Sequence, residues 1–472
     1  MKQPHLIVLF GATGDLARRK LLPGLMHLVE SHLVGDARIL GVSTHEYSDD
    51  EFREFALQAC KEFSTRPVRT DVWESFAQKL AFLPLGQGAE ALEARAAELE
   101  EQLGEGARRL HYLSVPPSAA LDVVHLIDDA HLVEDARIVM EKPFGTDVAS
   151  ARDLNAAIHE VFAEEQIFRI DHFLGKEAAL NILAFRFANG LFEPIWNRNF
   201  IDHVEIDVPE TLSVEGRAGF YEGTGAFKDM VVTHLFQVLA FMAMEPPTSL
   251  DSDSIGEEKN KVFRSMKPLV PAEMVRGQYE GYREHEGVDP DSETETFVAL
   301  KAEIDNWRWA GVPFYLRTGK RMAEGARIIS IAFNEPPKSM FPEGSGVGRS
   351  GPDHLTFDLA DSSRMSLSFY GKRPGPGMTL DKLSMQFAMQ ETGRSGDVLE
   401  AYERLIHDAM MGERTLFTTA EGIERLWEIS QPVLDDPPPV QSYPQGSWGP
   451  DAAIELVAPR RWRLPFERRW RG

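Results

Sequence analysis

The feature that most constrains the fold is a glycine-containing loop between an apolar run and a helical pattern. Residues 6–10, LIVLF, are all apolar, as expected of a parallel strand buried on both faces. The loop GATGDLA follows at 11–17, and apolar residues then recur at helical spacing to residue 30. Gly11 permits a tight turn, Gly14 lets a pyrophosphate approach the backbone, and Ala17 allows close helix packing. These features favour dinucleotide binding, with a plain structural turn as the alternative because the middle glycine of GxGxxG is absent.

Strand and helix patterns alternate over the first third of the chain. Strands are predicted at 37–43, 108–117 and 136–145, with helical stretches such as 89–104 between them. This alternation indicates an α/β, Rossmann-like doubly wound parallel sheet. Later stretches such as HVEIDVPE, ARIISIAF and RMSLSFYG are typical of an antiparallel sheet with one covered face. Because 472 residues exceed what one core usually serves, we expect a first domain over 1–175 and a larger α+β domain over 176–472.

Three further predictions concern segments of the second domain. The stretch MVVTHLFQVLAFMAM (230–244) is too short to span a bilayer and is interrupted by polar residues, so we expect a buried helix. Segments 247–257 and 340–353 are rich in Pro, Gly, Ser and Asp, and we expect surface loops there. The basic tail at 460–472 is expected to rest on the chain's own acidic surface or on a neighbouring subunit.

Charge and cysteine content limit the classes of function. A formal net charge of −24 argues against a general nucleic-acid or membrane binder, so an anionic substrate requires a local basic pocket. The single cysteine, Cys60, forms no internal disulfide and leaves nothing for a thiolate metal site, which fits a reducing, cytoplasmic compartment. The start of the chain, MKQPHLIVLFGATGD, is more typical of a first strand than of a signal peptide.

The stretch RIDHFLGKE (169–177) carries the clearest candidate site. In this stretch Asp171, His172 and Lys176 alternate with large apolar residues and a glycine. The charged residues therefore do not form one solvated face. Three ionisable groups beside an apolar wall indicate a functional site more than a solvated surface.

Seven stretches, in order along the chain, resemble the glucose-6-phosphate 1-dehydrogenase family. They are GATGDLARRKLLPGL, EKPFGTD, FRIDHFLGKE, FRFANGLFEPIWNRNFIDHV, VEGRAGFYEGTGAFKDMVVTHLFQ, GVPFYLRTGKR and YERLIHDAMMG. The resemblance implies a nucleotide-binding domain up to RIDHFLGKE, and then a substrate-binding and oligomerisation domain whose sheet carries much of a dimer contact. It also implies oxidation of D-glucose 6-phosphate to 6-phospho-D-glucono-1,5-lactone, the first step of the pentose phosphate pathway, by a homodimer or homotetramer.

The same resemblance implies a role for each site residue. His234 would be the general base and Asp171 the carboxylate that orients it, while His172 and Lys176 would hold the phosphate of the substrate. The remaining substrate-binding positions would be Glu210, Asp229, Lys320 and Lys142, the last lying between substrate and coenzyme. The coenzyme, NADP or NAD, would be held by Gly11, Thr13, Gly14, Asp15, Leu16, Ser43, Thr44, His45, Ser114 and Lys142. No metal is implied, because the nicotinamide accepts the hydride.

Without the family resemblance, the helix predicted at 230–244 could be a purely structural core helix. His234 lies in an apolar stretch, where a core histidine with satisfied hydrogen bonds is a common finding. Asp229 is five positions earlier, roughly 140° around an α-helix, so α-helical spacing does not place both on one face. The assignment of His234 as a base therefore depends on the family resemblance.

Three departures from the family pattern bear on specificity. Thr44 stands where relatives that use NADP commonly have arginine, so we expect NAD to be usable. Phe173 replaces a tyrosine that contacts the substrate phosphate, and Gly325 stands at a position usually basic, with Arg327 the nearest replacement. Two alternatives follow: an aldose dehydrogenase with relaxed phosphate recognition, or a dinucleotide-binding sensor without turnover.

Overall fold

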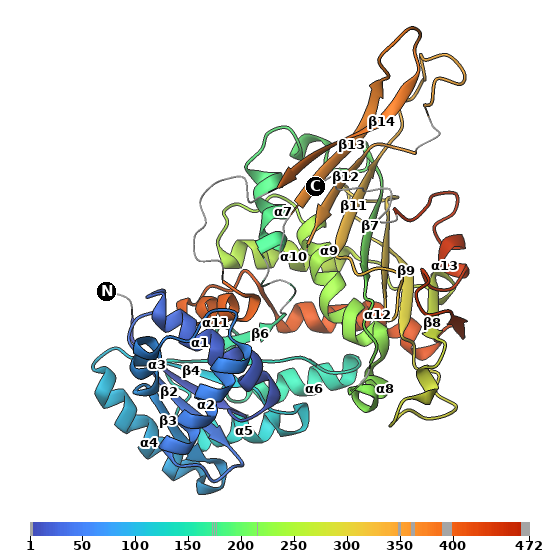
Figure 1. Ribbon diagram of the computed structural model, residues 1–472. Helices are drawn as coiled ribbons and strands as arrows, with labels where there is room; N and C mark the ends of the chain where they lie inside the picture. Colours follow the sequence, from blue (N-terminus) through green and yellow to red (C-terminus); the bar gives the residue numbers. More distant parts are fainter. Residues whose placement is uncertain are drawn as a thin grey trace. The chain divides into compact units, whose positions relative to one another are not determined.

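The computed structural model describes residues 3–171, 173, 175, 177–214, 216–347, 351–359, 364–388 and 399–463 (Figure 1). The chain forms two compact units, each built from several segments. The first unit comprises Met1–Gly175, Pro247–Glu257 and Gly396–Glu424. The second comprises Lys176–Pro246, Glu258–Ser395 and Arg425–Gly472.

A seven-stranded sheet forms the centre of the first unit. Its strands are β1 (His5–Phe10), β2 (Ala37–Ser43), β3 (Leu80–Pro84), β4 (Arg108–Leu113), β5 (Ala136–Met140), β6 (Ile167–Ile170) and β15 (Phe417–Thr418). Their order is β15-β6-β5-β4-β1-β2-β3, and all neighbours are parallel except β15 and β6. Every residue of β1 is buried, as expected of a central strand covered on both faces. The predicted doubly wound parallel sheet is therefore confirmed.

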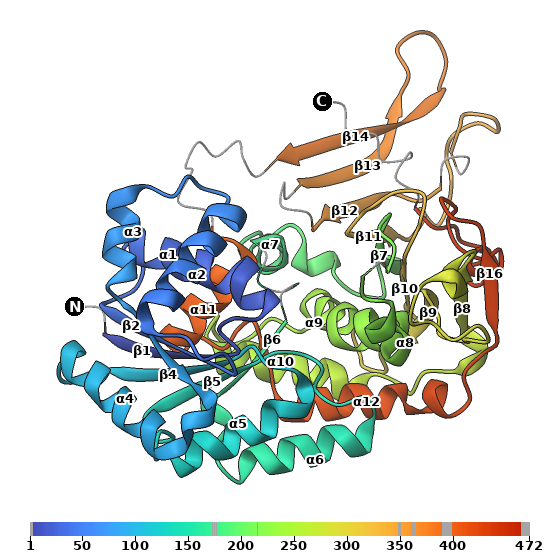
Figure 2. The same cartoon turned by 60° about the horizontal axis from the view of Figure 1, so that its bottom comes forward.

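Helices cover both faces of this sheet (Figure 2). One layer contains α1, α2, α3 and α11, and the other contains α4, α5 and α6. Their bounds are α1 (Leu22–Glu30), α2 (Asp49–Phe63), α3 (Thr70–Ala77), α4 (Gly88–Leu103), α5 (Pro117–Asp129), α6 (Val148–His159) and α11 (Ala401–Met411). A π-helical turn, η1 (Ala17–Leu21), precedes α1 directly, so the helix that follows the glycine loop is continuous to Glu30.

The second unit contains a nine-stranded, mainly antiparallel sheet. Its strands are β7 (Ile201–Pro209), β8 (Met274–Tyr279), β9 (Phe297–Glu303), β10 (Pro313–Gly319), β11 (Ile328–Phe333), β12 (His354–Asp358), β13 (Arg364–Lys372), β14 (Leu380–Ala388) and β16 (Val440–Tyr443). The order is β14-β13-β12-β11-β7-β10-β9-β8-β16. Only the β7–β10 and β8–β16 neighbours are parallel among the described strands. This arrangement confirms the predicted antiparallel sheet.

Helices pack on this sheet through its central strands. Apart from α11, the helices after residue 176 are α7 (Glu177–Phe187), α8 (Ala218–Ala226), the π-helix η5 (Phe227–Leu235), α9 (Phe236–Ala243), α10 (Ser252–Ser265), α12 (Ala420–Asp435) and α13 (Ala452–Glu455). Element η5 packs on β10 and against α9, which in turn packs against α7. Short 3₁₀ turns occur in both units at Leu85–Gln87, Glu164–Gln166, Glu193–Ile195, Pro271–Glu273 and Tyr282–Glu284.

The helical stretch Ala218–Ala243 is long and apolar enough to cross a membrane by length and composition alone. In its most apolar window, 83% of the residues are buried inside the protein. That burial is typical of a core helix, and it confirms the prediction of a buried helix at 230–244.

Two loop predictions had different outcomes. The described parts of 340–353 are irregular, as expected. The prediction of a loop throughout 247–257 is wrong, because α10 begins at Ser252. The Asp251 carboxylate accepts a hydrogen bond from the Ser254 backbone N–H at 2.8 Å, so the polar residues of this segment cap a helix instead of preventing one.

The described part of the basic tail is held by acidic residues of β7. Arg460 bonds both carboxylate oxygens of Asp202, at 2.7 and 3.1 Å, and the Arg463 backbone N–H donates to Glu205 at 2.9 Å. The prediction that the tail rests on the chain's own acidic surface is confirmed for these residues. Residues 464–472 lie outside the described part of the chain.

Candidate active site

The loop after β1 makes a tight turn that leads into the following helix. The Gly11 N–H donates to the Val42 carbonyl at 2.8 Å, and the helix begins at Gly14, whose carbonyl accepts from the Arg18 N–H at 2.9 Å. Gly11 has φ of +75°, and a Cβ there would lie 2.0 Å from the Ser114 carbonyl oxygen. Only glycine fits this position, and the loop reaches the helix N-terminus in the conformation that suits a pyrophosphate.

The threonine that replaces the middle glycine connects the loop to the end of β2. Thr13 Oγ1 donates to Ser43 Oγ at 3.1 Å and lies 3.0 Å from His45 Nδ1. The His45 backbone N–H donates to Ser43 Oγ at 3.2 Å, which closes a small cluster of hydroxyl and imidazole groups. Thr44 is exposed beside this cluster. The structure thus brings Thr13, Ser43 and His45 together at the position where this fold binds the adenosine ribose of a coenzyme or its 2′-phosphate.

The other predicted coenzyme residues occupy the helix and the neighbouring strand ends. Asp15 is exposed and accepts from Arg19 Nε at 2.6 Å one turn along the helix, while Leu16 is half-buried. Ser114 directly follows β4, and Lys142 lies two residues beyond β5 and is half-buried. The loop, the hydroxyl cluster, Ser114 and Lys142 therefore all lie at the carboxyl edge of the parallel sheet, where open α/β sheets bind their ligands.

Asp171 belongs to the same edge, because it follows β6 directly. It is buried, and its Oδ1 accepts a hydrogen bond from the Phe173 backbone N–H at 2.9 Å. Phe173, which replaces the expected tyrosine, thus orients the carboxylate through its backbone. The predicted phosphate-binding residues His172 and Lys176 lie outside the described residues.

Glu141 is a further acidic residue at this sheet edge, which the sequence did not single out. It directly follows β5, next to Lys142, and its Oε1 accepts from the Tyr112 hydroxyl at 2.6 Å. Burial raises the pKa of the Glu141 carboxyl to about 7, and the nearby Asp171 carboxylate acts in the same direction. The signal that could have identified it is positional, since it follows a parallel strand at the same sheet edge as the other candidates.

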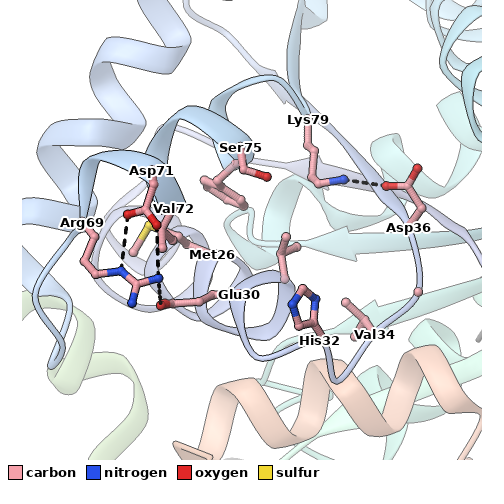
Figure 3. Close-up of a pocket in the computed structure, with 13 residues that line it drawn as sticks. Met26, Glu30, His32, Val34, Asp36, Arg69, Asp71, Val72, Ser75 and Lys79 are labelled. Carbon is pink, nitrogen blue, oxygen red and sulfur yellow. Dashed lines mark hydrogen bonds and ion pairs between the residues drawn. The ribbon is translucent and has the colours of Figure 1, made fainter.

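A cavity of about 500 Å³ in the first unit is not the coenzyme site (Figure 3). It is lined by residues that precede β2, including His32, Val34 and Asp36, so it lies at the amino end of that strand. Its charges are paired with one another, with Lys79 bonded to Asp36 at 2.5 Å and Arg69 close to Glu30 and Asp71. The cavity therefore lies away from the edge that carries the glycine loop.

In the second unit, Glu210 and Lys320 follow the neighbouring parallel strands β7 and β10. The Glu210 backbone N–H donates to the Gly319 carbonyl at 2.8 Å, and Lys320 Nζ forms an ion pair with Glu210 Oε2. Lys320 is held further because its N–H donates to Thr296 and its carbonyl accepts from the Tyr443 hydroxyl at 2.7 Å. Two of the predicted sugar-binding residues are therefore together at one strand edge.

The helix that carries Asp229 and His234 is a π-helix, and this corrects the expected spacing. In η5, hydrogen bonds run from residue i to i+5 instead of i+4, so residues five positions apart lie about one turn from each other. Asp229 and His234 therefore share a face, whereas α-helical spacing would separate them by roughly 140°. His234 is buried, and η5 packs on β10, the strand that Lys320 directly follows.

Glu295 fixes where this π-helix begins. Gly225 interrupts the helical stretch with φ of +65°, and a Cβ there would lie 2.4 Å from Glu295 Oε1. The same oxygen accepts from the Phe227 N–H at 3.0 Å, and the Glu295 carbonyl accepts from the Ala226 N–H at 2.9 Å. Since the next residue, Thr296, binds Lys320, one short segment holds both the helix of His234 and the lysine.

Gly325, which stands where a basic residue is usual in the family, has free space around it. Gly325 is exposed, and no atom lies within 4 Å of a Cβ built there. Arg327 is half-buried two residues later, immediately before β11. The absence of a basic side chain at Gly325 is therefore not a steric requirement.

The first unit has a glycine loop at the carboxyl edge of a parallel sheet, and the second has an acid–lysine pair next to a strand on which the helix of a buried histidine packs. These features define a class. That class is the nicotinamide-dinucleotide-dependent oxidoreductases. Two family models, "Glucose-6-phosphate dehydrogenase, NAD binding domain" and "Glucose-6-phosphate dehydrogenase, C-terminal domain", match residues 8–181 and 183–471. The chain belongs to the glucose-6-phosphate dehydrogenase family, as the sequence motifs predicted.

Individual relatives agree with this assignment over nearly the whole chain. The chain is 43% identical to glucose-6-phosphate 1-dehydrogenase of Rhizobium meliloti (strain 1021), with 96% of each chain covered. It is 39% identical to that of Aggregatibacter actinomycetemcomitans, with 97% of each covered. Among solved structures, the Mycobacterium avium glucose-6-phosphate 1-dehydrogenase has a TM-score of 0.87 at 37% identity, covering 98% of this chain and 99% of that one. A glucose-6-phosphate dehydrogenase solved in complex with glucose 6-phosphate has a TM-score of 0.90 at 29% identity, with the same coverage.

Proposed function

We propose that the protein oxidises D-glucose 6-phosphate at its anomeric carbon to 6-phospho-D-glucono-1,5-lactone, with NAD or NADP as hydride acceptor. The observation that carries the proposal is the arrangement in the second unit. There Glu210 and Lys320 pair at the ends of adjacent strands, and Asp229 and His234 share one face of a π-helix packed on β10. The proposed reaction is the first step of the pentose phosphate pathway, and the reducing compartment inferred from Cys60 supports a cytoplasmic location.

His234 acts in this proposal as the general base that removes the proton of the anomeric hydroxyl. A neutral imidazole suits this task because it accepts a proton near neutral pH. Asp171 holds the second ring nitrogen, which fixes the tautomer and stabilises the imidazolium that forms. Glu210, Asp229 and Lys320 bind sugar hydroxyls, and His172 with Lys176 binds the phosphate.

The first unit is proposed to hold the coenzyme and the second the sugar. The residues present fit a dinucleotide, because the backbone at Gly11 leaves no room for a Cβ and the turn leads directly into a helix. The N-terminus of a helix is a favourable position for a pyrophosphate. Thr13, Ser43 and His45 would contact the adenosine ribose or its phosphate, and Lys142 the nicotinamide end. When bound, the nicotinamide supplies the hydride acceptor.

Steady-state kinetics test this proposal most directly. Reduction of NAD and of NADP is followed at 340 nm with glucose 6-phosphate and, separately, with unphosphorylated glucose. Turnover that requires the phosphate supports the proposal, whereas equal efficiency with glucose identifies an aldose dehydrogenase with relaxed phosphate recognition, as Phe173 and Gly325 would allow. Absence of turnover with both sugars, in a protein that binds coenzyme, identifies a sensor.

Coenzyme preference gives a prediction at Thr44. Because the cluster of Thr13, Ser43 and His45 supplies no fixed positive charge, NAD is expected to serve at least as well as NADP. Changing Thr44 to Arg should raise the kcat/KM ratio of NADP over NAD by about tenfold or more, which is about 1.4 kcal/mol. Kinetics with both coenzymes at saturating sugar measure this ratio. A strong NADP preference in the wild type, unchanged by Thr44→Arg, would remove position 44 from the coenzyme site.

A second proposal concerns the oligomer, where we infer a homodimer formed through β13 and β14. Leu383, Met385 and Phe387 alternate along β14, and each is 47% exposed. They lie directly opposite Phe369, Leu367 and Met365 of β13, so all six share one face of the hairpin. Among the described strands β14 is an edge that pairs only with β13, and Figure 1 shows this long hairpin at the end of its sheet.

A second copy of the chain is the occupant that these observations favour. Exposed apolar edge strands promote association, and a self-complementary apolar face covered by its own copy is the usual route to a closed dimer. Replacing Met385 with Asp should convert the dimer to monomer in sedimentation velocity at micromolar concentration. Trp307→Ser, which removes an equally apolar but separate side chain that is 90% exposed, is the matched control and should leave the dimer intact. A wild-type monomer, or a dimer that survives Met385→Asp, would contradict this interface.

A further inference from the structure

Tyr221 is a buried tyrosine among the groups proposed to hold the sugar. It lies in α8, on the segment that leads through Gly225 into η5, and its side chain is 4% exposed. Lys320 Nζ lies 5.8 Å from the centroid of the Tyr221 ring, within the range of a cation–π contact. The ring is therefore next to the Glu210–Lys320 ion pair.

The acids of the site also act on the Tyr221 hydroxyl. Burial, and then the carboxylates of Asp229, Glu295 and Glu210, hold the pKa of this hydroxyl well above its usual range. The group is therefore protonated at neutral pH and can donate a hydrogen bond.

The Tyr221 hydroxyl has no structural partner within the described part of the chain. Its oxygen is fully buried, and no described residue forms a hydrogen bond with it. Neighbouring tyrosines of the same unit behave differently, because the Tyr282 hydroxyl donates to Glu222 at 2.7 Å and the Tyr443 hydroxyl donates to the Lys320 carbonyl. A buried hydroxyl without a partner costs free energy in the folded state, so it requires another explanation.

We propose that Tyr221 is a further substrate-binding residue, whose hydroxyl forms a hydrogen bond with a hydroxyl group of the sugar. The inference rests on the proposed function, because Glu210, Asp229 and Lys320 are its sugar-binding residues. The carboxylates accept and the lysine donates, whereas a phenol can do both and so matches the donor–acceptor character of a sugar hydroxyl. A site built to bond one hydroxyl also rejects sugars that lack it, so Tyr221 contributes to substrate selection.

The test replaces Tyr221 with Phe, which removes only the oxygen. Isothermal titration of the coenzyme-free protein with glucose 6-phosphate should show binding about 3- to 30-fold weaker than in the wild type. The melting temperature should stay unchanged or rise, because the deleted hydroxyl has no described partner in the fold. The 2-deoxy, 3-deoxy and 4-deoxy analogues of glucose 6-phosphate are then tested in turn. One of them should have the same affinity for the wild type and for Tyr221→Phe, because it lacks the sugar hydroxyl that Tyr221 binds.

Tyr282→Phe is the matched control, because it makes the same chemical change where the hydroxyl bonds Glu222. It should lower the melting temperature and leave affinity for glucose 6-phosphate unchanged. Equal affinity of the wild type and Tyr221→Phe for glucose 6-phosphate overturns this inference alone. Weaker binding together with a lowered melting temperature also overturns it, because that is the result expected of a purely structural tyrosine. Failure of the wild type to bind glucose 6-phosphate overturns the proposed function and this inference with it.

Discussion

Replacing His234 with Asn should lower kcat by at least about a hundredfold while the KM for glucose 6-phosphate changes little. A positioned general base contributes about 10²–10⁴-fold to rate, and asparagine keeps the approximate size of the side chain without accepting the proton. An interaction made only in the transition state lowers kcat and kcat/KM together, which is the pattern expected here. Steady-state rates with saturating coenzyme measure the effect.

A purely structural histidine would give a different result. His234 is buried in a helix at the centre of the second unit, so loss of packing could also lower activity. His285→Asn is a suitable control, because His285 lies in the same unit and its ring bonds the Tyr279 hydroxyl at 2.8 Å outside the proposed site. Circular dichroism and melting temperature of His234→Asn should match the wild type. Near-normal kcat in the folded variant would contradict the assignment of the base.

Most of the first unit could be predicted from the sequence because its strands are continuous apolar runs. A strand buried on both faces must be apolar throughout, and the loop after β1 must contain glycine where no Cβ fits. Three strands were missed, namely β3, β6 and the two-residue β15, and the first two were missed for physical reasons. β3 (LAFLP) is a short apolar run that periodicity cannot distinguish from a helix. β6 (IFRI) contains Arg169, which is buried only because it pairs with Glu164 at 2.8 Å.

The site helix illustrates what sequence spacing could not give. The common face of Asp229 and His234 depends on a π-helix, and that helix begins where Glu295, some seventy residues later in the chain, binds the Phe227 N–H. Such a contact is set by tertiary structure and leaves no period in the sequence. Thr13 is a similar case, because its hydroxyl is oriented by Ser43 and His45 at the end of another strand. The motifs identified candidate residues, and long-range contacts determine how those residues are arranged.

The buried pair of Arg317 and Asp207 connects β10 and β7, the two strands that Lys320 and Glu210 directly follow. Arg317 lies on β10 and Asp207 on β7, directly opposite each other. Two hydrogen bonds join them, Nε to Oδ1 at 2.9 Å and Nη2 to Oδ2 at 2.6 Å, and the side chains are only 1% and 2% exposed. The guanidinium also lies over the rings of Trp462 and Trp448, at 4.4 and 5.2 Å from their centroids. Neither charge can reach water if its partner is removed.

Replacing Arg317 with Leu should therefore lower the free energy of unfolding by about 3–5 kcal/mol, because a buried carboxylate is left without its partner. Urea unfolding followed by tryptophan fluorescence measures this in the second unit, since only Trp73 of the eight tryptophans lies in the first. The side chains of the pair Arg373–Asp381, beside the same sheet, are 59% and 43% exposed, so Arg373→Leu should destabilise the protein far less than Arg317→Leu. The double variant Asp207→Leu with Arg317→Leu should recover much of the loss, because the uncompensated charge is gone. Equal destabilisation by Arg317→Leu and Arg373→Leu would show that the buried pair does not hold β7 and β10 together. The position of Lys320 beside Glu210 would then depend on the surrounding backbone alone.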